Sequence, residues 1–211
     1  MPELRIPDQL EPDCDNCQGM CCMSMEHRII DGFPLENDKP ARVPCHNLET
    51  DASSPEDLYK CKIYEDRSYN GWRQCESFSC YGAGQTISQF FKELGVSWAI
   101  KSNDLKEDQN KIMIENLNLG FQVMYMVLSH LDAIGHTFDP LREKKVIAAK
   151  VAASKIALQF SEHLTANKKV DVAFWYSKNF LPAMASAEAE VSEKAIMDYV
   201  RRGLSIFRFS K

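Results

Sequence analysis

The chain has no long apolar run, no basic excess and no internal repeat. No uninterrupted apolar segment approaches the roughly 18 residues of a membrane span, so no membrane association is expected. Lys and Arg number 25 against 30 Asp and Glu, which argues against a nucleic-acid binder because phosphate affinity depends on clustered basic residues. The first residues lack a basic stretch followed by an apolar core, so no secretory signal is expected. These absences favour a soluble cytoplasmic protein that acts on an unknown protein or small-molecule partner.

Cysteine is absent after position 80, and all eight cysteines of the chain lie between positions 14 and 80. In the cytoplasm glutathione and thioredoxin keep thiols reduced, so such a cluster favours metal ligation over structural disulfides or unligated thiols. Metal binding to thiolates stabilises a folded segment by about 10 kcal/mol or more, and a segment with little apolar periodicity needs such a source of cohesion. The predicted metal ligands are Cys14, Cys17, Cys21, Cys22, Cys45, Cys61, Cys75 and Cys80.

The spacing of the cysteines indicates how a metal would be held. Cys14 and Cys17 form the Cys-x-x-Cys half-site that is usual for tetrahedral zinc. Side chains of adjacent residues such as Cys21 and Cys22 diverge in extended backbone, so these two thiolates suit two separate metals. Eight sulfurs in two groups of four would fill two zinc sites, and this ligand count favours Zn²⁺. Alternatively, four sulfurs would hold an iron–sulfur (Fe–S) cluster and four would remain for zinc or for no metal.

Composition divides the chain into two predicted domains. Residues 1–84 are rich in Pro, Asn, Asp, Ser and Gly, so we expect mostly loops and short turns that a metal stabilises. The character changes at Tyr81-Gly-Ala-Gly84, and residues 85–211 are predicted to be an α-helical bundle domain. The expected fold class is therefore mainly α: a loop-rich, metal-stabilised cysteine module followed by an antiparallel helical bundle.

Five segments of the second part are predicted to be helical or apolar. Thr86 and Gln89 have the form of a capping box that starts a helix over 86–94, with Gly95 in the left-handed position after its end. Segment 107–134 is the strongest helix signal, because apolar residues recur every three or four positions, namely Ile114, Leu117, Phe121, Met124, Leu128 and Leu131.

The remaining helix signals lie further along the chain. Asp139-Pro140 supplies an N-cap and a first-turn proline for a helix with an apolar, alanine-rich face, formed by Val146, Ala149, Ala153, Ile156, Ala157 and Phe160. An irregular apolar stretch then covers 170–184 and is interrupted by Pro182. The last predicted helix covers 187–202 and ends at Gly203.

The order of the cysteine motifs resembles a known family. The motifs are Cys14-x2-Cys17-x3-Cys21-Cys22, Pro44-Cys45-x2-Leu48, Cys61-Lys-Ile-Tyr-Glu-Asp-Arg67 and Cys75-x2-Phe78-x-Cys80. They resemble the zinc- or iron-chelating cysteine-cluster proteins of the YkgJ or CxxCxxCC family. The resemblance covers about residues 14–90, matches all eight cysteines in order, and implies that these cysteines chelate metal without a defined reaction.

Two further stretches narrow the resemblance. Lys39-Pro40-x2-Val43-Pro44-Cys45 and Cys80-Tyr-Gly-Ala-Gly-Gln85 are similar to the cysteine-rich N-terminal part of some bacterial pentapeptide-repeat proteins. Other members resemble the cysteine-bearing part of flagellin lysine methylases, which implies iron as an alternative metal. This chain departs from the pattern, because three residues rather than two precede Cys21-Cys22 and no pentapeptide repeats follow.

The predicted function is metal binding. An eight-cysteine cluster would hold zinc or iron, as a structural or interaction module. The alternative is an iron–sulfur protein that takes part in electron transfer or in modification of a protein or small molecule. A thiol-based redox sensor, which needs accessible thiols of low pKa, is a third class. No nucleophile with a paired base is identifiable, so no catalytic residues are predicted.

Overall fold

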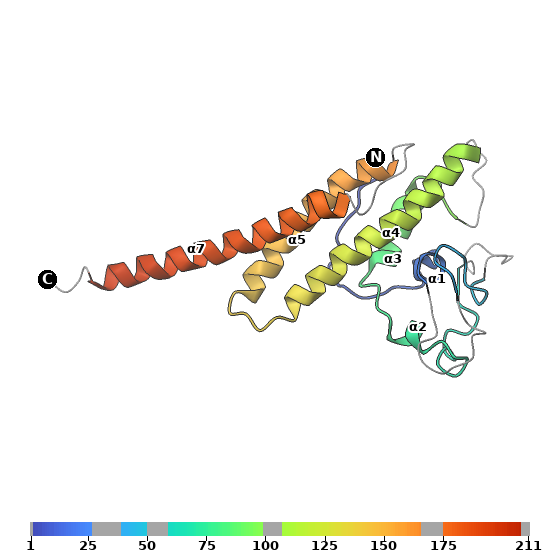
Figure 1. Ribbon diagram of the computed structural model, residues 1–211, viewed down its shortest axis with the longest axis horizontal. Helices are drawn as coiled ribbons and strands as arrows, with labels where there is room; N and C mark the ends of the chain where they lie inside the picture. Colours follow the sequence, from blue (N-terminus) through green and yellow to red (C-terminus); the bar gives the residue numbers. More distant parts are fainter. Residues whose placement is uncertain (1, 27–38, 50–58, 99–106, 166–174, 208–211) are drawn as a thin grey trace.

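A computed structural model describes residues 2–26, 39–49, 59–98, 107–165 and 175–207 (Figure 1). The fold is mainly α, as predicted, and the described ranges contain no strand, although an isolated antiparallel bridge pairs Leu48 with Cys61. Along the chain the helical elements are α1 (Met20–Ser24), α2 (Arg73–Ser77), α3 (Ala83–Glu93), α4 (Glu107–Gly135), α5 (Arg142–Thr165), a π-helical turn η2 (Tyr176–Phe180) and α7 (Leu181–Phe207).

Helix α4 lies at the centre of the molecule and packs against α1, α3 and α5. Its bounds confirm the helix predicted over 107–134. The predicted apolar stripe is buried from Leu117 to Leu131, while Ile114 is partly exposed. Leu119, Val123 and Val127 are buried as well, so α4 is covered on more than one side. That wider burial follows from its central place, because a helix with partners on several sides needs a broad apolar surface.

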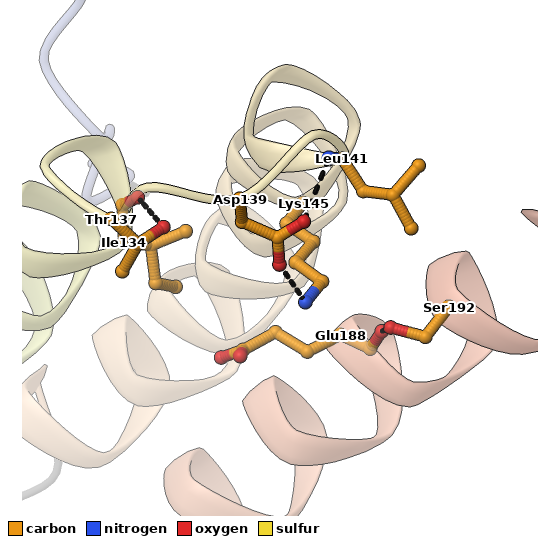
Figure 2. Close-up of polar contacts among 7 residues, drawn as sticks. All are labelled: Ile134, Thr137, Asp139, Leu141, Lys145, Glu188 and Ser192. Atoms are coloured by element: carbon orange, nitrogen blue, oxygen red, sulfur yellow. Dashed lines mark hydrogen bonds and ion pairs between the residues drawn. The ribbon is translucent and has the colours of Figure 1, made fainter.

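The connection from α4 to α5 is short and capped at both ends (Figure 2). The Thr137 hydroxyl donates to the Ile134 carbonyl at the end of α4, at 2.9 Å. Before α5, the Asp139 carboxylate accepts the Leu141 N–H at 2.7 Å and also pairs with the Lys145 ammonium. The Asp139 side chain therefore caps the turn that leads into α5, as predicted, although the helix begins at Arg142, after the predicted first-turn Pro140. This helix buries the predicted alanine-rich face.

Helix α3 begins earlier than predicted. It starts at Ala83 rather than at Thr86, and the Thr86 N–H donates to the Gly82 carbonyl at 3.2 Å, so Thr86 lies inside the helix. The predicted capping box is wrong, because Gly82 at φ 88° forms the start and no side chain caps it. The predicted left-handed Gly95 is confirmed by its φ of 69°.

Helix α7 differs from the prediction at both ends. It starts at Leu181 rather than at 187, directly after η2, and Pro182 therefore occupies its first turn, where a missing N–H is tolerated. It also continues through Gly203 to Phe207, since one glycine costs a helix interior only about 1 kcal/mol relative to alanine. Trp175 and Phe180 of the predicted irregular stretch are buried, whereas residues 170–174 lie outside the described residues.

The cysteine region packs directly against the helices (Figure 1). One cluster of buried apolar side chains includes Leu4, Met20 and Cys80 together with residues of α3, α4, α5 and α7. Helix α1 contacts both α3 and α4. A second, small cluster contains Cys45, Leu48 and Trp72. Across the described ranges, no helix has the length and apolarity required to cross a bilayer.

Candidate metal centre

Short helices and tight turns position the cysteines. Helix α1 carries Cys21 and Cys22, and α2 carries Cys75. Four other cysteines each begin a turn in which their carbonyl accepts an N–H three residues later, at 2.8 to 3.3 Å, namely Cys14, Cys45, Cys61 and Cys80. Turns of this type need no apolar periodicity, which explains why the sequence of this region shows none.

Seven of the eight cysteines line one cavity of about 580 Å³. The eighth, Cys80, lies beside it, because a Cβ atom built on Gly84 would be 2.7 Å from the Cys17 Sγ and 3.7 Å from the Cys80 Sγ. All eight lie in the described ranges, and no disulfide joins any of them. The fold therefore brings together cysteines that are up to 66 residues apart, from Cys14 to Cys80.

The cysteines can be assigned to two groups of four, six of them by the apolar cluster that each adjoins. Sulfur group 1 adjoins the large apolar cluster around α3 and α4, and it comprises Cys14, Cys17, Cys21 and Cys80. Sulfur group 2 surrounds Leu48 and Trp72, and it comprises Cys22, Cys45, Cys61 and Cys75. Cys14 belongs to the first group because burial and then the charges of Cys21 and Cys80 raise its pKa. Cys61 is assigned to the second because its backbone bridges to Leu48 and the charge of Cys45 raises its pKa. The charge of Cys21 also raises the pKa values of Cys61 and Cys75, so the two groups adjoin.

Cys21 and Cys22 are closer together than the sequence suggested. Their Sγ atoms are 3.9 Å apart, because they lie in helix α1 and not in extended backbone. The hydrogen bond from the Cys22 thiol lowers the pKa of Cys21 to about 7, and the same hydrogen bond together with burial raises the pKa of Cys22. The assignment of these two thiolates to separate metals stays a prediction.

Hydrogen-bond donors surround the sulfur of Cys17. The Met20 N–H donates to the Cys17 Sγ at 3.4 Å, and the Ser88 hydroxyl of α3 donates to the same atom at 3.7 Å. The Gln18 N–H in turn donates to the Ser88 oxygen at 2.7 Å. Burial raises the pKa of Cys17 to about 12, while the Met20 and Ser88 donors act in the opposite direction. Such donors favour the thiolate, which is the form that binds metal.

Backbone donors also reach other sulfurs. The N–H groups of Gly82 and Gly84, at the start of α3, lower the pKa of Cys80 against the larger effect of burial. The Ile63 N–H does the same for Cys61. The N-terminal end of a helix carries partial positive charge, so the start of α3 favours a thiolate at Cys80.

A buried lysine lies among the sulfurs. Lys39 is only 4% exposed, and its ammonium group donates to the carbonyls of Met23, Met25 and Pro40. Burial lowers its pKa, whereas the thiolate charges of Cys22 and neighbouring cysteines raise it. Burying a cation is costly unless negative charge lies nearby. The buried Lys39 ammonium would therefore favour the thiolate form of the neighbouring cysteines. Sequence reasoning missed its role, although Lys39 begins one of the motifs that carry the family resemblance.

Arg67 supplies a second positive charge. Its guanidinium carbon lies 3.8 Å from the centre of the Tyr64 ring, and both residues line the cavity. Its charge lowers the pKa values of Cys14, Cys61 and Cys75, although burial raises all three overall, that of Cys75 to about 11. The Arg67 Nε is buried and has no hydrogen-bond partner among the described residues. An unsatisfied donor beside the sulfurs suits a thiolate acceptor.

The cysteine side chains as placed do not form a closed ligand set. Within ranges 2–26, 39–49, 59–98, 107–165 and 175–207, no group of three or more His, Cys, Asp or Glu side chains has the geometry to hold a metal ion. The donor set nevertheless fits a soft metal, since it consists of thiols with N–H donors and two cations around them.

Comparison with known proteins adds one relative. A stretch of 89 residues is 35% identical to "Uncharacterized protein YybG" of Bacillus subtilis (strain 168). The match covers 42% of this chain and 28% of the relative's length. No family model matches the chain, and no solved structure matches it either.

Proposed function

We propose that the chain is a metal-binding protein in which sulfur group 1 and sulfur group 2 each hold one zinc ion. The observation that supports this proposal most is that eight cysteines distant in sequence lie in or beside one cavity, three of them against the large apolar cluster and three against the small one. Four thiolates are the complement of a tetrahedral zinc site. The resemblance of the cysteine order to the YkgJ or CxxCxxCC family supports the same proposal.

Charge balance supports thiolate ligation at these positions. A zinc ion with four thiolates carries a net charge of −2, which would be costly to bury without nearby cations. The charges of Cys22 and Cys45 in sulfur group 2, and of Cys21 in sulfur group 1, raise the pKa of Lys39, and Arg67 lowers the pKa of cysteines in both groups. The buried ammonium of Lys39 and the unsatisfied Nε of Arg67 each gain a favourable partner when the thiols ionise.

In this proposal the metal acts structurally. It holds the loop-rich module of residues 1–84 in shape beside an antiparallel bundle formed by residues 85–211, and the module presents a surface to an unidentified protein or small ligand. In the part of the cysteine region that the structure describes, the helices before α3 are the short α1 and α2, and one small apolar cluster lies there. Metal binding would supply the stabilisation that such a small core lacks.

The size of the cavity favours a second candidate, an iron–sulfur cluster. A volume of about 580 Å³ exceeds what single ions in closed tetrahedral sites need, and a polynuclear cluster also takes four cysteine ligands. In that case one sulfur group would hold the cluster, and the protein would take part in electron transfer or in a modification reaction.

Purification under anaerobic conditions, followed by elemental analysis and an absorption spectrum, tests both candidates. The zinc proposal predicts a colourless protein with about two zinc ions per chain, one for each four-thiolate site. A brown protein with iron and inorganic sulfide would replace it with the iron–sulfur candidate. A protein that folds normally, carries no metal and takes up none when zinc or iron is supplied would refute both.

A further inference from the structure

Residues 2–13 form a strap that lies against the helices before the first cysteine, and the blue trace between the N label and α1 in Figure 1 follows it. Leu4 is only 3% exposed and belongs to the large apolar cluster, and Ile6 and Leu10 pack against the same cluster. Burial removes apolar surface from water, so these three side chains dock the strap on the helices.

In the described part of the chain, two helix side chains tie the strap to the helices by hydrogen bonds. Gln85 of α3 donates from its Nε2 to the Glu11 carbonyl at 2.8 Å, and its Oε1 accepts the Asp13 N–H at 3.2 Å. Lys150 of α5 donates to the Asp8 carbonyl at 3.3 Å. Within the described ranges, no hydrogen bond between backbone groups joins the strap to another segment. A segment held in this way opens locally at a lower free-energy cost than the packed helices do.

The strap also adjoins sulfur group 1 at two places. A Cβ atom built on Gly82 would be 3.1 Å from the Pro7 Cγ and 3.5 Å from the Glu11 oxygen, so the strap lies beside the turn that follows Cys80. At its far end the strap continues into Cys14, and its last residues line the cavity. The strap therefore links two candidate ligands of one sulfur group.

The cysteines of sulfur group 2 are joined more firmly. The Cys45 N–H donates to the Cys22 carbonyl at 3.0 Å, and backbone hydrogen bonds of 2.7 to 2.8 Å join the segment after Cys45 to the segment around Cys61. Cys14 of sulfur group 1 is exposed, and its carbonyl accepts the Cys17 N–H of its own turn at 3.3 Å. Sulfur group 1 therefore has one ligand whose place depends on the strap, whereas the backbone segments of sulfur group 2 are paired with each other.

We infer that the strap is a latch that opens sulfur group 1 to metal exchange while sulfur group 2 stays closed. When the strap lifts, Cys14 loses its support and moves away from Cys17 and Cys80, which leaves three sulfurs at the site. Zinc in a closed structural site has four ligands, so the opened site releases or takes up the ion more readily. When Leu4 returns to the apolar cluster, the site closes. The exchange of metal rests on the proposed function, whereas the movement of the strap does not.

Removal of zinc by an excess of chelator tests the latch in the metal-loaded chain. Leu4→Ala removes the apolar anchor, and Gln85→Ala removes two hydrogen bonds. Gln89→Ala, at an exposed position one turn further along α3, is the matched control. The wild type is expected to lose its zinc in two phases, and both strap changes should speed the faster phase by about fivefold or more, since each removes contacts that hold the strap down. The slower phase should stay at the wild-type rate, and the control should match the wild type in both phases.

Alkylation of the chain as purified tests the movement of the strap whether or not metal is bound. Cys80 and Cys45 are each 8% exposed, but Cys80 precedes the turn beside the strap and Cys45 belongs to sulfur group 2. Mass spectrometry of peptides measures the alkylation rate of each. Both strap changes should raise the rate at Cys80 by about fivefold or more and leave the rate at Cys45 unchanged, because only a local opening is made easier. Helical circular dichroism checks that the variants fold, and Gln85→Ala decides the result if Leu4→Ala unfolds the chain.

The outcomes separate the latch from the metal proposal. Zinc-loaded variants that lose both phases at wild-type rates, or Cys80 and Cys45 rates that rise together, would overturn the latch and leave the metal proposal standing. A chain that binds no metal would overturn the metal proposal and the exchange with it. A selective rise at Cys80 in that chain would still support the movement of the strap.

Discussion

Gly84→Ala tests whether the sulfurs beside α3 are held by a metal. A Cβ atom at this position would lie 2.7 Å from the Cys17 Sγ and 3.7 Å from the Cys80 Sγ, and the first distance is shorter than real Cβ contacts. A free Cys17 side chain can rotate away at small cost. A metal-bound Cys17 cannot, so either α3 must shift or a metal–sulfur bond must lengthen.

The expected effects of Gly84→Ala therefore differ between the two states of the protein. In the metal-free state, alanine should be neutral or stabilise α3 by up to about 1 kcal/mol, because it is the better helix former. In the metal-bound state, we expect a loss of affinity of about 10- to 100-fold, as is typical when groups around metal ligands are changed. That loss corresponds to about 1.4 to 2.8 kcal/mol.

Competition against a chelator of known affinity measures the loss, and thermal unfolding with and without the chelator measures stability. Gly135→Ala is the matched control, because a Cβ at Gly135, also in a helix, meets nothing within 4 Å. It should leave metal affinity unchanged. Equal metal affinity for Gly84→Ala and wild type would refute the placement of a ligand at Cys17.

Three further changes probe other parts of the account. Cys17→Ser should lower the metal content and the unfolding temperature, because it removes one charged ligand from a site that couples metal binding to folding; unchanged values of both would contradict this. Lys39→Met should destabilise the protein by about 1–3 kcal/mol in chemical denaturation, since three carbonyls lose their donor, and should weaken metal binding; Lys62→Met, at an exposed lysine, is the control. Asp139→Asn should reduce stability at neutral pH, because Lys145 and the Leu141 N–H lower the carboxyl pKa below 3.8. A lowered pKa stabilises the fold above the ordinary value and loses that effect as the pH falls through the folded-state value, so the gap in unfolding temperature between the two proteins should close in acid.

Local signals predicted the central helices well. Helix α4 coincides with the apolar periodicity of residues 107–134, and α5 comes directly after the turn at Asp139-Pro140. Both signals depend only on residues close together in the sequence. The start of α3 was mispredicted because Gly82 forms it with backbone geometry alone, which leaves no side-chain signature. Helix α7 passes Gly203 because a glycine signals a helix end without enforcing one.

Sequence reasoning identified the cysteines of the candidate site but not the residues that surround them. Cysteine count and spacing single out all eight thiols, and the structure brings them to one region. The role of Ser88 depends on a contact with Cys17 across 71 positions of sequence, and that of Lys39 on the fold of the loop around it. The 3.9 Å approach of Cys21 and Cys22 required knowing that this pair lies in a helix.

The most direct test of a sulfur-held metal is X-ray absorption at the metal edge of the loaded protein. The zinc proposal predicts a single shell of about four sulfur atoms at about 2.3 Å. The same spectrum for Cys17→Ser should lose sulfur from that shell. A shell made of oxygen and nitrogen atoms would contradict the claim that the cysteines of this chain bind the metal.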